Sequence, residues 1–236
     1  MRLAVLMTNT DESAFAQQHP KDGEKFSRLI AGVRAGWEVT SFNVKDDIFP
    51  DDIQIFDGVI ITGSPASVHD QDPWVARLLA LIRDIYANEI PMFGACYGHQ
   101  AIALALGGAA EANPKGWVFG VAHSEVRKRM PWMAHLPSRF AQYAAHVEAV
   151  TQLPKGAAVL SVSENCAITG FHIGDKVYTT QNHPEMSHAF MTALIEEYAP
   201  KLPDGVGDAA RASMAVNADN DSYAESIARF FETTKE

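Results

Sequence analysis

Residues 91–108 constrain the fold of this chain more than any other stretch, because a short apolar run, a cysteine and a helical pattern follow one another directly. The run 91–95 is too short and too closely bounded by glycine to be a helix, so it predicts a buried strand. The small and apolar residues after Cys96 end at the glycine pair 107–108, which predicts a helix with a glycine C-cap. Cys96 is therefore expected in a sharp turn between a strand and a helix.

Gly94 and Gly98 lie two residues on either side of Cys96, which is the spacing of the G-x-nucleophile-x-G elbow with cysteine in place of serine. Such an elbow needs glycine where neighbouring backbone approaches with no room for a Cβ atom. It would place the Cys96 sulfur at a helix N-terminus, where the helix dipole favours thiolate over thiol. The alternative is that Cys96 is a small buried hydrophobic residue.

The composition excludes several classes of protein. The 236 residues carry a formal net charge of -10, which argues against nucleic acid or an anionic membrane as the main partner. No stretch approaches the ~20 apolar residues of a membrane span, and the apolar run 3–7 is too brief for a signal peptide. Two cysteines provide no disulfide framework, so we expect a cytoplasmic protein.

Strand and helix patterns alternate over the first part of the chain. Apolar runs predict buried strands at 3–7, 37–44, 57–61 and 91–95. Helical spacing of apolar residues predicts helices at 24–35, at 73–88 and after Cys96, whereas the polar segment 11–23 is expected to be a loop. This alternation predicts an α/β fold, in which right-handed crossovers build a central, mostly parallel sheet with helices on both faces.

The remaining chain is richer in strands, some of which are expected to be antiparallel strands of the same domain. They are predicted at 117–126, 140–145, 157–162, 167–172 and 177–180, with a hairpin turn at 173–177. Helices are predicted at 187–198, 208–217 and 222–231. We therefore expect one domain over residues 1–190 and a structural helical extension, residues 191–236, packed on it.

Two further residues complete a possible catalytic triad with Cys96. Pro184 favours an extended backbone at His183, and in an extended segment His183 and Glu185 face the same side. A catalytic cysteine needs a base for its proton, and that base needs an acceptor that fixes its tautomer. We therefore interpret Cys96 as the nucleophile, His183 as the base and Glu185 as the acceptor.

The motifs at 94–100, Gly-Ala-Cys-Tyr-Gly-His-Gln, and at 181–185, Gln-Asn-His-Pro-Glu, together resemble those of the class I glutamine amidotransferases with a Cys-His-Glu triad. The resemblance is greatest to the amidotransferase half of GMP synthase and to stand-alone proteins related to it. Residues 62–68 resemble the oxyanion loop of the family, and residues 146–150 resemble its His-x-Asp/Glu-x-Val segment. The resemblance covers about residues 1–190.

The resemblance implies an activity and further site residues. The Cys96 thiolate would attack the side-chain amide carbon of glutamine or of another γ-glutamyl amide, and His183 would protonate the leaving ammonia and then activate water. Backbone N–H groups of Gly63 and Tyr97 would form the oxyanion hole. No metal and no organic cofactor is implied. The residues expected to hold the amino and carboxylate groups of the substrate are Ser64, Gln100, His146 and Val147.

Two segments depart from the pattern of the family. Asn182 stands where an aromatic residue is usual, and residues 116–120 lack the acidic residue of a Gly-Trp-Glu-like segment. Neither departure removes a member of the triad. The residue at position 182 changes the pocket wall next to His183, and both departures affect the expected substrate or ammonia acceptor.

Other histidines and the second cysteine are expected to be structural. His99 is predicted to be a packed histidine, because His183 already supplies the base. Cys166 has no histidine near it in the sequence and is predicted to lie in the core. The remaining histidines share no metal-ligand spacing, so no metal site is predicted.

Three functions remain open from the sequence. The first is a glutaminase that passes ammonia to a separate synthetase subunit, since the chain contains no nucleotide-binding P-loop of its own. The second is a stand-alone hydrolase of γ-glutamyl peptides. The third is a non-catalytic binding or regulatory module, against which the complete set Cys96, His183 and Glu185 argues.

Overall fold

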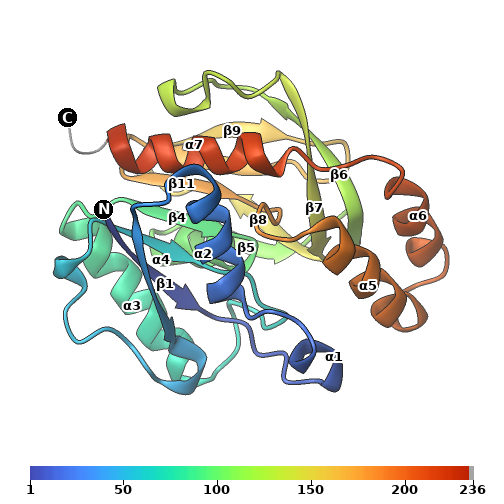
Figure 1. The fold of residues 1–236 in the computed structure, drawn as a ribbon, viewed down its shortest axis with the longest axis horizontal. Coiled ribbons are helices and arrows are strands. Elements are labelled where there is room, and N and C mark those ends of the chain that lie inside the picture. Colours follow the sequence, from blue (N-terminus) through green and yellow to red (C-terminus); the bar gives the residue numbers. More distant parts are fainter. Residues whose placement is uncertain (234–236) are drawn as a thin grey trace.

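The computed structural model describes residues 1–233, and its largest element is a nine-stranded sheet with the order β2-β1-β3-β4-β11-β10-β9-β6-β7 (Figure 1). A separate two-stranded sheet pairs β5 with β8. The strands are β1 (Arg2–Met7), β2 (Glu38–Asn43), β3 (Gly58–Ile61), β4 (Met92–Ala95), β5 (Ala109–Ala112), β6 (Val118–Val126), β7 (Arg139–His146), β8 (Glu148–Gln152), β9 (Ala157–Val162), β10 (Gly170–Ile173) and β11 (Val177–Thr180).

Helices flank the large sheet. The α-helices are α1 (Ala14–Gln17), α2 (Asp22–Val33), α3 (Pro73–Ala87), α4 (Tyr97–Ala105), α5 (His188–Tyr198), α6 (Val206–Ser213) and α7 (Asn220–Thr233). Short 3₁₀ helices lie at Val44–Asp46, Ile53–Ile55, Pro131–Met133 and Ala199–Lys201. Within residues 1–233, none of the helices has both the length and the apolar character needed to cross a bilayer.

The sheet has a parallel part and an antiparallel part. Strands β2, β1, β3, β4 and β11 pair in parallel, as expected from the alternation of strands and helices. Strands β11, β10, β9, β6 and β7 pair antiparallel and extend the same sheet. The structure thus confirms a single α/β domain with a parallel centre and additional antiparallel strands.

The two faces of the sheet are covered by different helices because successive side chains of a strand point to opposite faces. Along β1, Ala4 and Leu6 pack into the core formed with α3 and α4. Leu3 and Val5 pack into the core formed with α2 and α7. The fully apolar strands predicted from the sequence are therefore buried on both sides.

The C-terminal helix α7 belongs to the second of these cores. Its buried side chains share one cluster with Phe26 and Ile30 of α2 and with Phe93 of β4. Arg34, which ends α2, also forms ion pairs with Glu225 and Glu232 of α7. The buried side chains of α7 in this cluster are Tyr223, Ile227, Phe230 and Phe231. The predicted boundary between a domain and a C-terminal extension at residue 190 stays a prediction.

Three parts of the predicted secondary structure were wrong. The loop predicted at 11–23 contains α1, because the Ser13 side chain accepts a hydrogen bond from the Ala16 N–H (3.1 Å) and caps a helical turn. The strand predicted at 167–172 begins only at Gly170, because the chain before it is bent, with the Ser163 N–H donating to the carbonyl of Cys166 (2.9 Å). Strands β5 and β8 were not predicted, because they are short and their stability comes from pairing with each other across a long sequence separation.

Replacing Phe230 by Ala tests the contribution of α7 to the domain. Phe230 is fully buried, so Phe230→Ala should lower the free energy of unfolding by about 3–5 kcal/mol through lost burial and the remaining cavity. Urea titration followed by circular dichroism measures this change. Ile55 is 48% exposed, so Ile55→Ala serves as the control and should change the free energy by less than about 0.5 kcal/mol. Equal stability of the two variants would contradict the assigned role of α7.

Candidate active site

Cys96 occupies the turn between β4 and α4 in a strained backbone conformation. Its φ is 50° and its ψ is -106°, a region that residues with a side chain rarely adopt. The Cys96 N–H donates to the carbonyl of Thr180 (2.9 Å), and the Gly98 N–H donates to the carbonyl of Thr62 (3.0 Å). The turn is therefore held between the chain that follows β3 and the end of β11.

The glycines on either side of Cys96 are required by close packing. A Cβ atom on Gly94 would lie 2.7 Å from the carbonyl carbon of Gly98. A Cβ atom on Gly98 would overlap the backbone carbonyl oxygen of Ile61 in β3. Since α4 lies this close to the sheet, the expected reason for the Gly-x-Cys-x-Gly spacing is confirmed.

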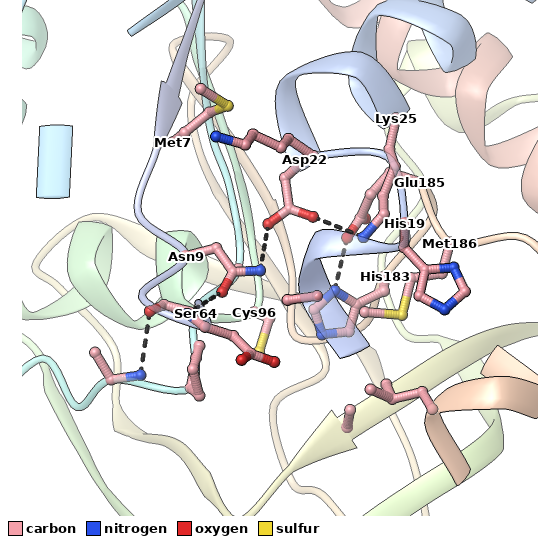
Figure 2. Close-up of a pocket in the computed structure, with 18 of the residues that line it drawn as sticks. Met7, Asn9, His19, Asp22, Lys25, Ser64, Cys96, His183, Glu185 and Met186 are labelled. Atoms are coloured by element: carbon pink, nitrogen blue, oxygen red, sulfur yellow. Dashed lines mark hydrogen bonds and ion pairs between the residues drawn. The ribbon is translucent and has the colours of Figure 1, made fainter. Parts of the chain in front are cut away.

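His183 and Glu185 lie next to Cys96, as Figure 2 shows. The His183 Nδ1 is 2.7 Å from the Glu185 Oε1, and both side chains are buried. Because a carboxylate only accepts hydrogen bonds, Nδ1 carries a proton and Nε2 is the nitrogen available to the sulfur. The backbone of His183 is fixed by its N–H, which donates to the carbonyl of Tyr143 in β7 (2.8 Å).

The protonation of His183 depends on its two charged neighbours. Burial alone would lower the pKa of His183, but the Glu185 carboxylate and the Cys96 sulfur raise that pKa well above its ordinary value. The buried imidazolium is thus favoured by the two groups on either side of it, the Glu185 carboxylate and the Cys96 sulfur. A protonated histidine is the form that can donate a proton to the leaving group when a cysteine is the nucleophile.

The two residues expected to form the oxyanion hole lie beside this pair. A Cβ atom on Gly63 would be 2.6 Å from the Cε1 of His183 and 3.4 Å from the Cβ of Cys96, so the Gly63 backbone lies close to both side chains. Tyr97 is the first residue of α4, and its N–H therefore has no acceptor within the helix. The Tyr97 side chain is buried and packs on Trp74, with ring centroids 5.7 Å apart.

A cavity of about 570 Å³ opens at the triad. Gln100 donates from its Nε2 to the carbonyl of Glu148 (3.0 Å), and the Nδ1–H of His146 donates to the same carbonyl (2.9 Å). Burial lowers the pKa of His146 to about 4, so this ring is neutral at pH 7. The sequence-predicted residues that line the cavity are Gly63, Ser64, Cys96, Gln100, His146, Val147, His183 and Glu185.

Part of the cavity wall was not predicted. The chain after β1 contributes residues that follow the carboxyl end of a parallel strand, a place where ligands commonly bind, and this position was the available signal. Leu194 and Tyr198 of α5 also line the cavity, although their segment was expected to be structural. The residues missed after β1 include Asn9, Asp11, Phe15, His19, Asp22 and Lys25.

The residues expected to be structural lie in the core. His99 is fully buried, its Nδ1 is 2.8 Å from the Thr179 hydroxyl, and burial lowers its pKa to about 3. Cys166 is buried, and burial raises the pKa of its thiol to about 11. In the part of the chain that the structure describes, no group of three or more His, Cys, Asp or Glu residues is arranged to hold a metal ion.

Residues 25–197 match the family model "Glutamine amidotransferase class-I". Gamma-glutamyl peptidase 3 of Arabidopsis thaliana is 28% identical over 168 residues, which cover 68% of this chain and 67% of the peptidase. The glutamine-hydrolysing GMP synthase of Caldicellulosiruptor saccharolyticus is 33% identical over 153 residues, which cover 64% of this chain but only 29% of the synthase.

A solved structure shares the fold over almost the whole chain. A glutamine amidotransferase from Thermotoga maritima superposes with a TM-score of 0.77 and covers 98% of both chains. The two sequences are 19% identical, so the similarity concerns the fold.

Replacing Glu185 by Gln tests the electrostatics of the site. Glu185→Gln removes a negative charge next to His183 but leaves its burial, so the pKa of His183 should fall. The pKa is measured by NMR titration of the His183 Cε1–H resonance, assigned by its loss in His183→Gln. Glu148→Gln is the matched control, since Glu148 lines the same cavity and its carboxylate accepts from Ser67. A pKa of His183 that is the same in both variants would show that Glu185 does not hold the imidazolium.

Proposed function

The chain belongs to the class I glutamine amidotransferase family, and from this we propose that it hydrolyses the side-chain amide of glutamine or of a γ-glutamyl compound through a thioester on Cys96. The observation that supports this most strongly is the strained Cys96 at a helix N-terminus beside a buried His183–Glu185 pair. A structural cysteine would require neither the strain nor the buried charge.

In the first step, the Cys96 thiolate attacks the amide carbon of the substrate and forms a C–S bond. The charge on the carbonyl oxygen is stabilised by the backbone N–H groups of Gly63 and Tyr97. The imidazolium of His183 gives its Nε2 proton to the amide nitrogen, so the C–N bond breaks and ammonia or an amine leaves. A γ-glutamyl thioester on Cys96 and a neutral His183 remain.

In the second step, neutral His183 takes a proton from water, and the hydroxide attacks the thioester carbon. The C–S bond breaks, glutamate leaves, and the thiolate and imidazolium are restored. Glu185 stays ionised throughout and stabilises the imidazolium. Ser64, Gln100, His146 and Val147 are proposed to hold the amino and carboxylate groups of the γ-glutamyl part.

Two versions of this function differ in the leaving group. In the first, the substrate is glutamine and a synthetase on another chain receives the ammonia, as suggested by the relationship to a GMP synthase. In the second, the protein acts alone on γ-glutamyl peptides, as suggested by the relationship to a γ-glutamyl peptidase. The size of the cavity, about 570 Å³, favours the second version, because such a volume suits ligands larger than one amino acid.

Hydrolysis by the isolated protein tests the proposal. Purified protein is incubated with glutamine and with a panel of γ-glutamyl dipeptides, and free glutamate and ammonia are measured. We expect release that falls to background in Cys96→Ala, because the thioester cannot form. A diazoketone analogue of glutamine that labels Cys96 without any release would indicate a subunit that needs its synthetase. If neither release nor labelling occurs, the proposed chemistry is wrong.

Gly63→Ala tests the oxyanion loop. The added Cβ atom would collide with the His183 ring, so the loop or the base must move, and kcat should fall by about 10²-fold or more. Gly32→Ala is the matched control, because a Cβ atom at Gly32 meets nothing within 4 Å. If both variants keep full kcat, the backbone of Gly63 does not take part in the reaction.

A further inference from the structure

The cavity has a second wall, formed where α1 and α5 approach each other. Phe15 of α1 and Phe190 of α5 both line it, and their ring centroids are 6.0 Å apart. We call this surface the α1–α5 wall; it consists of Phe15, His19, Met186, Phe190, Leu194 and Tyr198. Most of it is apolar, whereas the residues expected to hold the γ-glutamyl group are polar or present backbone.

The α1–α5 wall is held in place by its own contacts. The His19 ring lies 4.5 Å from that of Phe15 and 5.1 Å from that of Phe190, centroid to centroid. The Tyr198 hydroxyl donates to a carboxylate oxygen of Asp11 (3.1 Å) and so joins α5 to the chain before α1. The wall is therefore preformed, which lowers the entropic cost of binding against it.

Two of the lysines that line the cavity, Lys25 and Lys45, are already paired. The Lys25 Nζ is 2.9 Å from the Asp22 carboxylate and 3.7 Å from the centroid of the Phe190 ring. The Lys45 Nζ is 2.6 Å from the Glu12 carboxylate. Since these two cations are engaged, neither is free to form a new ion pair with the ligand, and the rings of the wall offer apolar contact instead.

The wall lies on the side of the triad where the leaving group must be. His183 donates its proton to the departing nitrogen, so the amine part of the substrate lies beside the His183 ring. Figure 2 shows His19 and Met186 on this side of Cys96, whereas Ser64, expected to hold the γ-glutamyl part, lies on the other. Met186 also follows Glu185 directly in the chain, which fixes it next to the triad.

We propose that the α1–α5 wall is the subsite for the leaving amine, and that the preferred substrates are γ-glutamyl peptides in which the next residue has a large apolar side chain. This inference rests on the proposed function and names the substrate class of the same site. Burial of an apolar side chain against the wall favours such peptides over glutamine and over γ-glutamylglycine, since the leaving group of neither carries an apolar side chain.

A matched series of substrates tests the subsite. The kcat/KM values for γ-Glu-Gly, γ-Glu-Ala, γ-Glu-Leu and γ-Glu-Phe are compared, because these peptides differ only in one side chain. We expect kcat/KM to rise by about 10- to 200-fold from glycine to leucine or phenylalanine. We expect γ-Glu-Lys and γ-Glu-Glu to stay near the glycine value.

Two variants assign the preference to the wall. Phe190→Ala and Phe15→Ala remove rings from opposite sides of it, and each should lower the ratio of kcat/KM for γ-Glu-Phe to that for γ-Glu-Gly by about tenfold. Phe49→Ala is the matched control: Phe49 is also partly buried and lies under the guanidinium of Arg77, as Phe190 lies under Lys25, but it is outside the cavity. In Phe49→Ala, the ratio of kcat/KM for γ-Glu-Phe to that for γ-Glu-Gly should equal the ratio in the wild-type protein.

The outcomes separate the subsite from the proposed function. Equal Cys96-dependent hydrolysis of every dipeptide, or a preference that Phe190→Ala and Phe15→Ala leave intact, would overturn the subsite while the hydrolase proposal stands. A preference for the charged dipeptides would also overturn it. If no member of the series is hydrolysed in a Cys96-dependent way, the proposed peptide hydrolysis and the subsite fall together.

Discussion

The close approach of α4 to the sheet is the constraint on which the site depends. Without side chains at Gly94 and Gly98, the turn that carries Cys96 fits between the chain after β3 and the end of β11. The chain after β3 contains Gly63, and the chain after β11 contains His183. Gly63, Cys96 and His183, the residues proposed as oxyanion loop, nucleophile and base, therefore meet because three neighbouring parallel strands end at the same edge.

The electrostatics of the site follow from this assembly. An imidazolium buried alone would lose its proton, and a carboxylate buried alone would be costly. His183 between Glu185 and Cys96 avoids both costs, because each charge faces an opposite one. Burial has the opposite effect on His99 and His146: within residues 1–233 neither ring forms an ion pair with a carboxylate, and burial lowers the pKa of both. The neighbours of a buried histidine, and not its burial alone, therefore determine the direction in which its pKa shifts.

The sequence predicted the features that are encoded locally. Short apolar runs indicated the parallel strands, and the Gly-x-Cys-x-Gly spacing indicated the elbow. The motif around His183 indicated the other two residues of the proposed triad, and the structure places Cys96, His183 and Glu185 next to one another. Strands β5 and β8 and the α1–α5 wall could not be predicted, because each depends on contacts between distant segments. Phe15 and Phe190, for example, are ordinary partly buried aromatic residues until the fold places them at one cavity.

The backbone strain at Cys96 has a consequence for how this chain changes over generations. The backbone conformation of Cys96 costs of order 1–3 kcal/mol of folding free energy for a residue with a side chain, whereas glycine adopts it freely. In a lineage released from selection for the reaction, substitution by glycine would raise stability and remove the sulfur in a single step. Random substitution and selection for stability would then both favour the loss of Cys96. The side chain at position 96 is thus a cost in stability for which the proposed reaction would account.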